Sequence, residues 1–173
     1  AYNGGYAVGA FNVNNMEIVQ GITEACREVS APVILQVSKG ARAYANHTYL
    51  VNLVKSAVTE CPEIPIALHL DHGSYEGAKA CVEAGFSSIM FDGSHYAIDE
   101  NVAKTTELVA LAHENGLSIE AEVGSIGGEE DGVVGMGEIA DAAECARIAS
   151  LGIDFLAAGI GNIHGVYPSN WKG

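Results

Sequence analysis

Two carboxylates and two histidines of this chain have the chemistry of a metal site. Asp92, Glu122, His72 and His164 each lie at or shortly after the end of a short apolar run. Neutral imidazole nitrogen and carboxylate oxygen are ligands that suit Zn2+ and related ions. None of the four residues belongs to a local ligand motif of the H-x-x-E-H or C-x-x-C type. A metal site is therefore predicted only if the fold brings them together.

The apolar runs have the pattern of short strands that alternate with helices. We expect strands at residues 6–12, 33–38, 66–71, 88–92, 118–123 and 155–160. Apolar residues recur at helical spacing between them, and Pro or Gly ends the helices. This alternation predicts a parallel sheet. Repeated units of this length also occur in solenoids, but these units share no side-chain consensus, which favours a barrel or a doubly wound sheet.

Polar residues at the predicted strand ends would meet at one mouth, because parallel strands present their carboxyl ends on the same side of a sheet. They are Asn12, Ser38, Asp71 with His72, Asp92, Glu120 with Glu122, and His164 after the last strand. Asn, Ser and Asp at such positions could equally cap the following helices. The unbroken succession of polar strand ends favours a functional site over capping alone.

The charge balance argues against some partners and restricts others. A net charge of −14 would repel nucleic acid and anionic membrane surfaces. An anionic substrate would need local cations, backbone amides or a metal ion. The cysteines form no C-x-x-C pair, and no apolar run approaches the ~18 residues of a membrane span. We therefore expect a cytoplasmic protein with reduced thiols.

Four segments, in sequence order, resemble successive motifs of the class II (zinc-dependent) fructose-1,6-bisphosphate or ketose-bisphosphate aldolases. They are HLDHG at residues 69–73, FDGSH at 91–95, EAEVGSIGGEEDG at 120–132 and GNIHGVY at 161–167. GAFN at 9–12 and QVSKG at 36–40 are similar to the family's first two strands. The resemblance implies a TIM (β/α)8 barrel. Residues 1–173 would form a single domain with about the first six βα units, truncated at the C-terminus and slightly at the N-terminus.

The resemblance also implies a ligand set. His72 and His164 correspond to two of the three histidines that hold the catalytic Zn2+ in the family, and no residue here matches the third. Asp92 and Glu122 correspond to carboxylates that can hold a metal at an alternative position. The family further allows a second divalent metal, and a monovalent cation in the phosphate region near Gly165.

Catalytic and substrate-binding roles follow from the same resemblance. Asp71 would be the acid/base at the substrate C4 oxygen, and Glu130, on a mobile loop, would be the base toward the dihydroxyacetone phosphate carbon. Asn12 would contact the substrate, and Ser38 would contact a phosphate. The implied reaction is the reversible cleavage of fructose 1,6-bisphosphate to two triose phosphates in glycolysis, by a homo-oligomer, commonly a dimer. Tagatose 1,6-bisphosphate, which differs in configuration at C4, is the alternative substrate.

Other functions are compatible with parts of the sequence. A lysine-dependent aldolase would need a desolvated amine on an inward strand position, but only Lys39 lies near a predicted strand end. GIGNIHG at 159–165 resembles a dinucleotide loop, yet its third glycine is one residue late. A non-catalytic phosphosugar-binding barrel fragment would retain the motifs without turnover. Of the remaining histidines, we expect His69 to pack inside the barrel and His113 to be solvated near a helix C-terminus.

Overall fold

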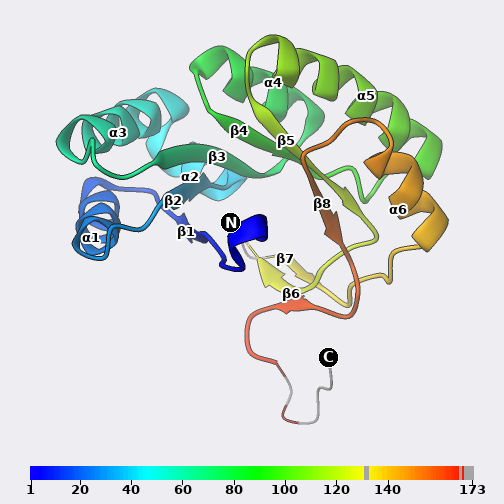
Figure 1. Ribbon diagram of the computed structural model, residues 1–173. Helices are drawn as coiled ribbons and strands as arrows, with labels where there is room; N and C mark the ends of the chain where they lie inside the picture. The colour runs from blue at the N-terminus through cyan, green and yellow to red at the C-terminus, as the bar shows by residue number, and fades with distance from the viewer. Residues whose placement is uncertain (131–132, 168, 170–173) are drawn as a thin grey trace.

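A curved sheet of parallel strands organises the molecule. The computed structural model describes residues 1–130, 133–167 and 169. Its six-stranded sheet has the order β1-β2-β3-β4-β5-β8, and each neighbouring pair is parallel. The strands are β1 (Gly9–Asn12), β2 (Val33–Val37), β3 (Ile66–Gly73), β4 (Ser88–Phe91), β5 (Ser118–Val123) and β8 (Phe155–Ala158). Figure 1 shows an open half-barrel with helices around its outer face, as a partial TIM barrel requires.

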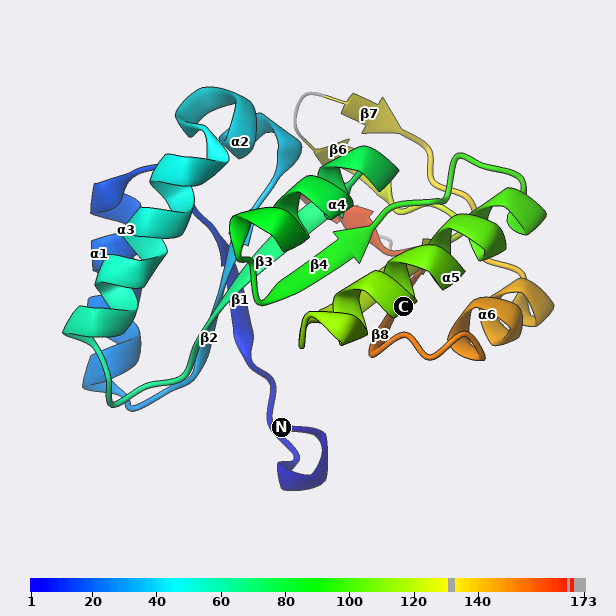
Figure 2. The same cartoon turned by 90° about the horizontal axis from the view of Figure 1, so that it is seen from above.

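The helices begin and end at residues suited to those positions. They are α1 (Met16–Glu28), α2 (Lys39–Ala45), α3 (His47–Glu60), α4 (Tyr75–Ala84), α5 (Ile98–Glu114) and α6 (Ala142–Ala149). Asn15 caps α1 by accepting a hydrogen bond from the Ile18 N–H, and Asp141 caps α6. Gly85 ends α4 with φ 89°, the left-handed conformation that favours glycine. A 3-10 turn, η1 (Tyr2–Gly4), precedes β1 and projects from the sheet in Figure 2.

The hydrophobic core lies between the sheet and the helices. Four adjacent strands contribute fully buried residues to one cluster with α3 and α5: Leu35, Leu70, Ile89 and Ile119. Burial of each such side chain contributes ~1.5–3 kcal/mol. Strand residues of the opposite parity face the concave side. On β3 and β5 these are polar, namely His69, Asp71, Glu120 and Glu122. Packing of the outer face therefore orients the polar residues of the inner face.

A second sheet lies at the mouth of the half-barrel. In it β6 (Gly127–Glu130) pairs antiparallel with β7 (Val133–Gly135) and parallel with β9 (Ile163–His164). Figure 2 shows β6 and β7 on the side toward which β4 points. The backbone of the predicted loop around residue 130 is thus a hairpin paired to β9. Its glycine-rich sequence has no strand pattern, and the pairing with β9 is non-local.

The predicted strand boundaries agree with the structure at β5 and differ by a few residues elsewhere. β1 begins at Gly9 instead of residue 6, β8 ends at Ala158 instead of residue 160, and β3 continues to Gly73. The short helix α2 was not expected; it begins because the Ser38 hydroxyl accepts a hydrogen bond from the Ala41 N–H. Within the described residues, no helix is both long and apolar enough to span a membrane.

Candidate metal centre and active-site cavity

Three predicted metal ligands come together at the mouth of the half-barrel. His72 Nδ1 lies 3.2 Å from Asp92 Oδ2 and 3.5 Å from Glu122 Oε2. One ligand atom from each of the three residues lies within 4.8 Å of those of the other two. Zn2+ ligand atoms sit about 2.0–2.3 Å from the ion, so small side-chain shifts would let all three reach one cation. A divalent ion would also offset both carboxylate charges, whereas a proton on His72 offsets only one.

An irregularity in β3 places His72. The pairing of β3 with β4 shifts register between Leu70 and Gly73, and His72 has φ 46°. This left-handed conformation is uncommon for residues other than glycine and costs about 1–3 kcal/mol when the surroundings impose it. A Cβ at Gly73 would crowd the Leu70 side chain and the Met90 carbonyl oxygen. Glycine at position 73 therefore permits the tight backbone approach that accompanies the turn of His72.

Asp92, directly after β4, is held as an anion. Its Oδ1 accepts hydrogen bonds from the Ser94 N–H at 3.1 Å and the Ser94 hydroxyl at 2.6 Å. Burial alone would raise the pKa of Asp92, but these bonds, the His72 hydrogen bond and the His72 charge lower it to about 2. The sequence interpretation missed Ser94, although an Asp followed two residues later by Ser is a common turn signal.

Glu122 places a buried carboxylate beside His72. The residue is only 2% exposed and lies on the inner face of β5. Its Oε1 is 3.3 Å from the Ile126 N–H, and its Oε2 faces His72. A buried carboxylate is stable as an anion only with hydrogen bonds and a cationic partner. The buried position of the Glu122 carboxylate therefore suits a residue that binds a cation.

His164 approaches the same cluster from the small sheet. Its ring centroid lies 5.5 Å from that of His72, with an interplanar angle of 75°. The residue ends β9, which pairs with β6 through Gly128 and His164. The structure thus gathers all four candidate ligands predicted from the sequence, with His164 beside His72. The assignment of His72 and His164 to the catalytic ion, and of Asp92 and Glu122 to an alternative position, stays a prediction.

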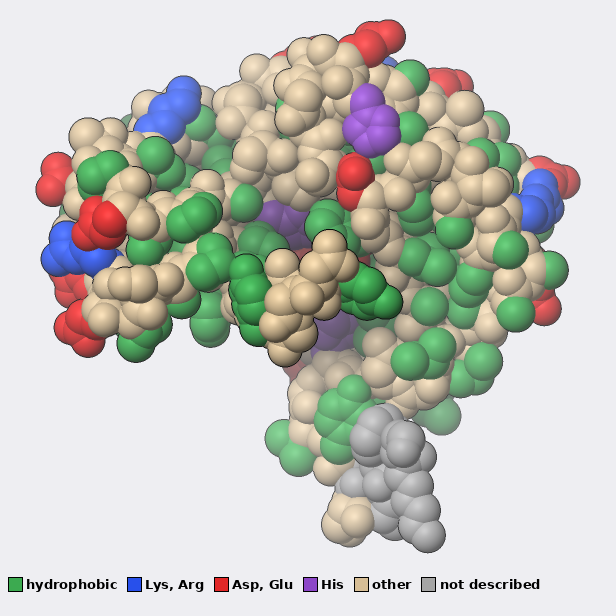
Figure 3. Space-filling model, viewed as in Figure 1, with side chains coloured by type: hydrophobic (Ala, Val, Ile, Leu, Met, Phe, Trp, Pro, Cys, Tyr) green, Lys and Arg blue, Asp and Glu red, His purple; other side chains and the backbone are tan. Residues whose placement is uncertain are grey.

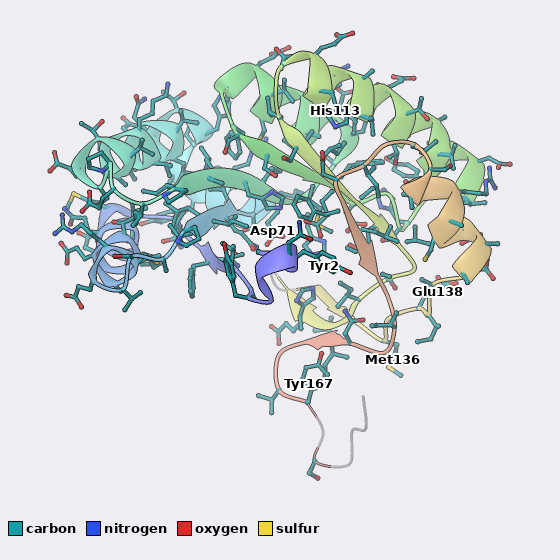
Figure 4. All side chains as sticks on the ribbon, viewed as in Figure 1. Tyr2, Asp71, His113, Met136, Glu138 and Tyr167 are labelled. Atoms are coloured by element: carbon teal, nitrogen blue, oxygen red, sulfur yellow. The ribbon has the colours of Figure 1, made fainter. Side chains whose placement is uncertain are left out.

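The four candidate ligands line a cavity of about 550 Å3. Figure 3 shows histidine surface within the hollow on the concave side of the molecule. Ser38 and Lys39, from the end of β2 and the start of α2, line the cavity together with the metal cluster. The small sheet and the segment after it close another side with Gly127, Gly128, Met136 and Glu138. Met136 and Glu138 are labelled in Figure 4.

The other predicted site residues occupy distinct positions. Asp71 is buried on β3 directly before His72 and is labelled in Figure 4. Asn12 is exposed at the end of β1, where its Oδ1 accepts a hydrogen bond from Gln36 Nε2 at 3.2 Å. Gly165, with φ 102°, follows β9 and is exposed. Glu130 belongs to β6, but its side chain lies outside the described part of the structure.

His69 supports the inner face of the sheet, as expected. It is 7% exposed, and its Nδ1 lies 2.8 Å from the Ser88 hydroxyl. Its Nε2 is 3.6 Å from Glu120 Oε2. Burial, followed by the charge of His72, lowers the pKa of His69 to about 4. A neutral imidazole with both nitrogens near polar partners suits packing beneath the ligands and not metal ligation.

Comparisons with known proteins agree with this geometry. The model of the family "Fructose-bisphosphate aldolase class-II" matches residues 1–172. A fructose-bisphosphate aldolase of Streptococcus pyogenes serotype M3 is 52% identical over all of this chain and 60% of the relative, and one of Mycoplasma pneumoniae is 53% identical over 97% and 59%. The chain thus spans about 60% of the length of the curated relatives that it matches.

Solved structures show the same relationship. A Coccidioides immitis protein assigned as a fructose-1,6-biphosphate aldolase superposes with a TM-score of 0.86 at 35% identity, over 96% of this chain and 60% of that one. The YdjI aldolase of Escherichia coli K12 gives 0.81 at 31% identity, over 98% and 60%. Together with the family match over residues 1–172, these likenesses confirm the resemblance seen in the motifs. The chain belongs to the class II fructose-bisphosphate aldolase family.

Proposed function

We propose that the whole protein catalyses the metal-dependent, reversible cleavage of fructose 1,6-bisphosphate to dihydroxyacetone phosphate and glyceraldehyde 3-phosphate. The observation that carries the proposal is the convergence of His72, Asp92 and Glu122 at one edge of a cavity lined by Ser38 and Lys39. Family membership and the names of the relatives support this reaction. Because the chain covers only part of their length, the activity is assigned to the whole protein.

His72 and His164 would hold the catalytic Zn2+, and Asp92 with Glu122 would provide an alternative position for it or for a second divalent ion. The mixture of imidazole and carboxylate donors is chemically suited to Zn2+. When bound, the ion would supply Lewis acidity toward the negative charge that forms as the C3–C4 bond breaks. Further ligands in the whole protein, including the third histidine of the family, are part of the proposal.

Asp71 would exchange the proton at the C4 oxygen. Its carboxyl group is buried on the concave side, one residue before His72, so it can reach a substrate held near the metal ligands. The second proton transfer, at the carbon of the three-carbon fragment, needs a separate group in a different environment. We assign it to Glu130, since β6 borders the same cavity.

Phosphate recognition would begin at the carboxyl end of β2. The Ser38 hydroxyl and the Lys39 ammonium line the cavity and supply a hydrogen-bond donor and a local positive charge. The charge is needed because the chain carries a net −14. Asn12 would contact the sugar, and Gly165 would border the phosphate and monovalent-cation region.

A cytoplasmic homo-oligomer, commonly a dimer, completes the proposal. The four cysteines are free thiols, and Cys61 and Cys81 are buried. Burial raises the pKa of Cys81 to about 11, despite the nearby charge of Arg42, so this thiol is unreactive at neutral pH. Such thiols are typical of reducing compartments.

The test is turnover of the purified whole protein with fructose 1,6-bisphosphate, measured by coupled detection of the triose phosphates. We expect a chelator to abolish cleavage and added Zn2+ or Co2+ to restore it. Cleavage that is unaffected by complete metal removal would reject the mechanism, and the absence of cleavage by metal-loaded protein would reject the function. Parallel assay of tagatose 1,6-bisphosphate assigns the substrate, because the two sugars differ only at C4.

A further inference from the structure

Asn101 is a buried polar residue that contacts the backbone behind the metal cluster. It lies in the first turn of α5 and is 3% exposed. Its Nδ2 donates a hydrogen bond to the backbone carbonyl of Glu122 at 3.0 Å, and its Oδ1 accepts one from the Thr105 hydroxyl at 3.0 Å. Thr105 is fully buried. The two bonds fix the orientation of the Asn101 amide, because only its nitrogen can donate and only its oxygen can accept.

The hydrogen bond reaches β5 where the sheet pairing on one side ends. β4 ends at Phe91, whose register partner is Ala121, so Glu122 lies one residue beyond the β4–β5 pairing. A buried backbone carbonyl needs a partner, and the Asn101 amide provides one. The same bond docks the start of α5, whose N-cap residue Ala97 makes no capping hydrogen bond.

The Asn101 amide also packs against the segment that carries Asp92. Gly93 follows Asp92 directly, and a Cβ at Gly93 would overlap the Asn101 side-chain amide. One side chain therefore contacts the backbone of one metal-site carboxylate and the residue adjacent to the other. A leucine of similar size could fill this space without hydrogen bonds, and an amide there is favourable only because both its polar groups are paired.

We propose that Asn101 is a positioning residue for the metal site: through the Glu122 carbonyl and Gly93 it holds Glu122 and Asp92 at the separation that a shared cation requires. Thr105 orients Asn101. The inference rests on the metal site of the proposed function and adds to it a residue outside the family-like motifs quoted above. Groups behind metal ligands commonly change metal affinity about 10–100-fold when they are lost.

The experiment measures Co2+ affinity by titration calorimetry and the visible absorption of the Co2+ form, together with urea unfolding of each variant. Asn101→Leu removes both hydrogen bonds at similar volume. Thr23→Val is the matched control, since it removes the buried hydroxyl that bonds to the Val19 carbonyl in α1, on the opposite flank of the half-barrel. We expect Asn101→Leu to weaken Co2+ binding at least about tenfold and alter the spectrum, and Thr23→Val to leave both unchanged.

A Co2+ affinity and spectrum of Asn101→Leu equal to those of the wild type would overturn the inference. If Asn101→Leu does not fold, the pair Thr105→Val and Thr105→Ser decides, because only serine keeps the hydroxyl that orients Asn101. We expect weaker Co2+ binding in Thr105→Val and wild-type binding in Thr105→Ser; equal binding in both would overturn the inference. Wild-type protein that takes up no Co2+ would instead reject the proposed metal site itself, and the inference with it.

Discussion

The half-barrel and the small sheet contribute to the same cavity in different ways. The half-barrel places His72, Asp92 and Glu122 on or directly after β3, β4 and β5, above a core of fully buried side chains. The small sheet brings His164 on a two-residue strand, and its neighbourhood includes residues as exposed as Met136 at 99%. The site thus combines candidate ligands on a packed scaffold with one candidate ligand, His164, whose position depends on a few backbone contacts.

This difference assigns separate tasks to the two regions. Side chains on packed elements are held more precisely than those on short, exposed segments. The half-barrel therefore sets the spacing of the carboxylates and His72. The small sheet is held to β9 by the pairing of Gly127 and Gly128, so the position of His164 depends on that pairing.

The largest expected effect is the loss of a ligand from either region. His72→Ala and His164→Ala, made in the whole protein, should each reduce metal-dependent cleavage by at least ~1000-fold, or ~4 kcal/mol of transition-state stabilisation. Turnover at saturating Zn2+ is the measurement. His47→Ala, at a half-buried histidine that does not line the cavity, serves as the control. Full activity of the His164 variant would show that His164 is not an essential ligand.

Shortening a buried side chain of the half-barrel should act mainly on the stability of the fold. Leu70→Ala removes a fully buried side chain behind His72 and should lower the free energy of unfolding by ~2–5 kcal/mol. The change is read from denaturant unfolding. Met136→Ala, at an almost fully exposed position in the wall of the cavity, should stay within ~0.5 kcal/mol of wild type. Equal losses in the two variants would contradict the proposed division.

A methyl group can disturb the small sheet selectively. Gly128 has φ 96°, and a Cβ there would overlap the His164 backbone, so Gly128→Ala should separate β6 from β9 and displace His164. We expect cleavage to fall ~10-fold or more, since the strain is on the order of 1–3 kcal/mol, with little change in the unfolding of the half-barrel.

Gly135→Ala is the matched control for this experiment. Gly135 is the register partner of Gly128 in the hairpin, and a Cβ there would meet nothing within 4 Å. The Gly135→Ala protein should cleave the substrate at the wild-type rate. Equal rates in both alanine variants would mean that the β6–β9 pairing does not position His164.

The smallest expected effect concerns the last strand of the half-barrel. Burial would raise the pKa of Asp154, but hydrogen bonds from the Ile119 N–H and His113, with the His113 charge, lower it. A carboxylate with a lowered pKa stabilises the fold above its ordinary pKa, and this contribution is lost as the pH falls through the lowered value. The stability difference between wild type and Asp154→Asn should therefore shrink in acid. A difference that is constant with pH would contradict this.

His113 has a partner that the sequence did not indicate. The residue is exposed near the C-terminus of α5, as expected, and its Nε2 lies 3.1 Å from Asp154 Oδ2. The partner is 41 residues away in sequence, before β8, so no local pattern could indicate it. The ring is still close to half exposed, as the helix position suggested.

The sequence was most informative where regular patterns carry the fold. The strand at residues 118–123 was placed correctly because apolar residues alternate there with Glu120 and Glu122. Neighbouring carboxyl ends of parallel strands then brought His72, Asp92 and Glu122 together as predicted. The small sheet was missed because glycines have low strand propensity and β6 pairs with residues far along the chain.

The contacts that hold the candidate ligands in place could not be predicted from the sequence patterns either. The register shift at His72 depends on how β3 pairs with β4. In the sequence, only the neighbouring Gly73 hinted at an irregular backbone there. Asn101 lies in a helix whose sequence reads as ordinary, and its role appears only when α5 docks on β5. Contacts that link separate elements decide such details, whereas strand and helix periodicity reflect each element alone.

The backbone of His72 restricts how the proposed metal site could change its metal preference during evolution. Among common metal ligands, His and Asp adopt the left-handed conformation comparatively readily, and bulkier residues do so at greater cost. A softer ion would be favoured by thiolate ligands, but cysteine at position 72 would have to accept the same backbone. Exchanges of ligand type are therefore easier at Asp92, after β4, and at Glu122, on β5, than at the histidine between them.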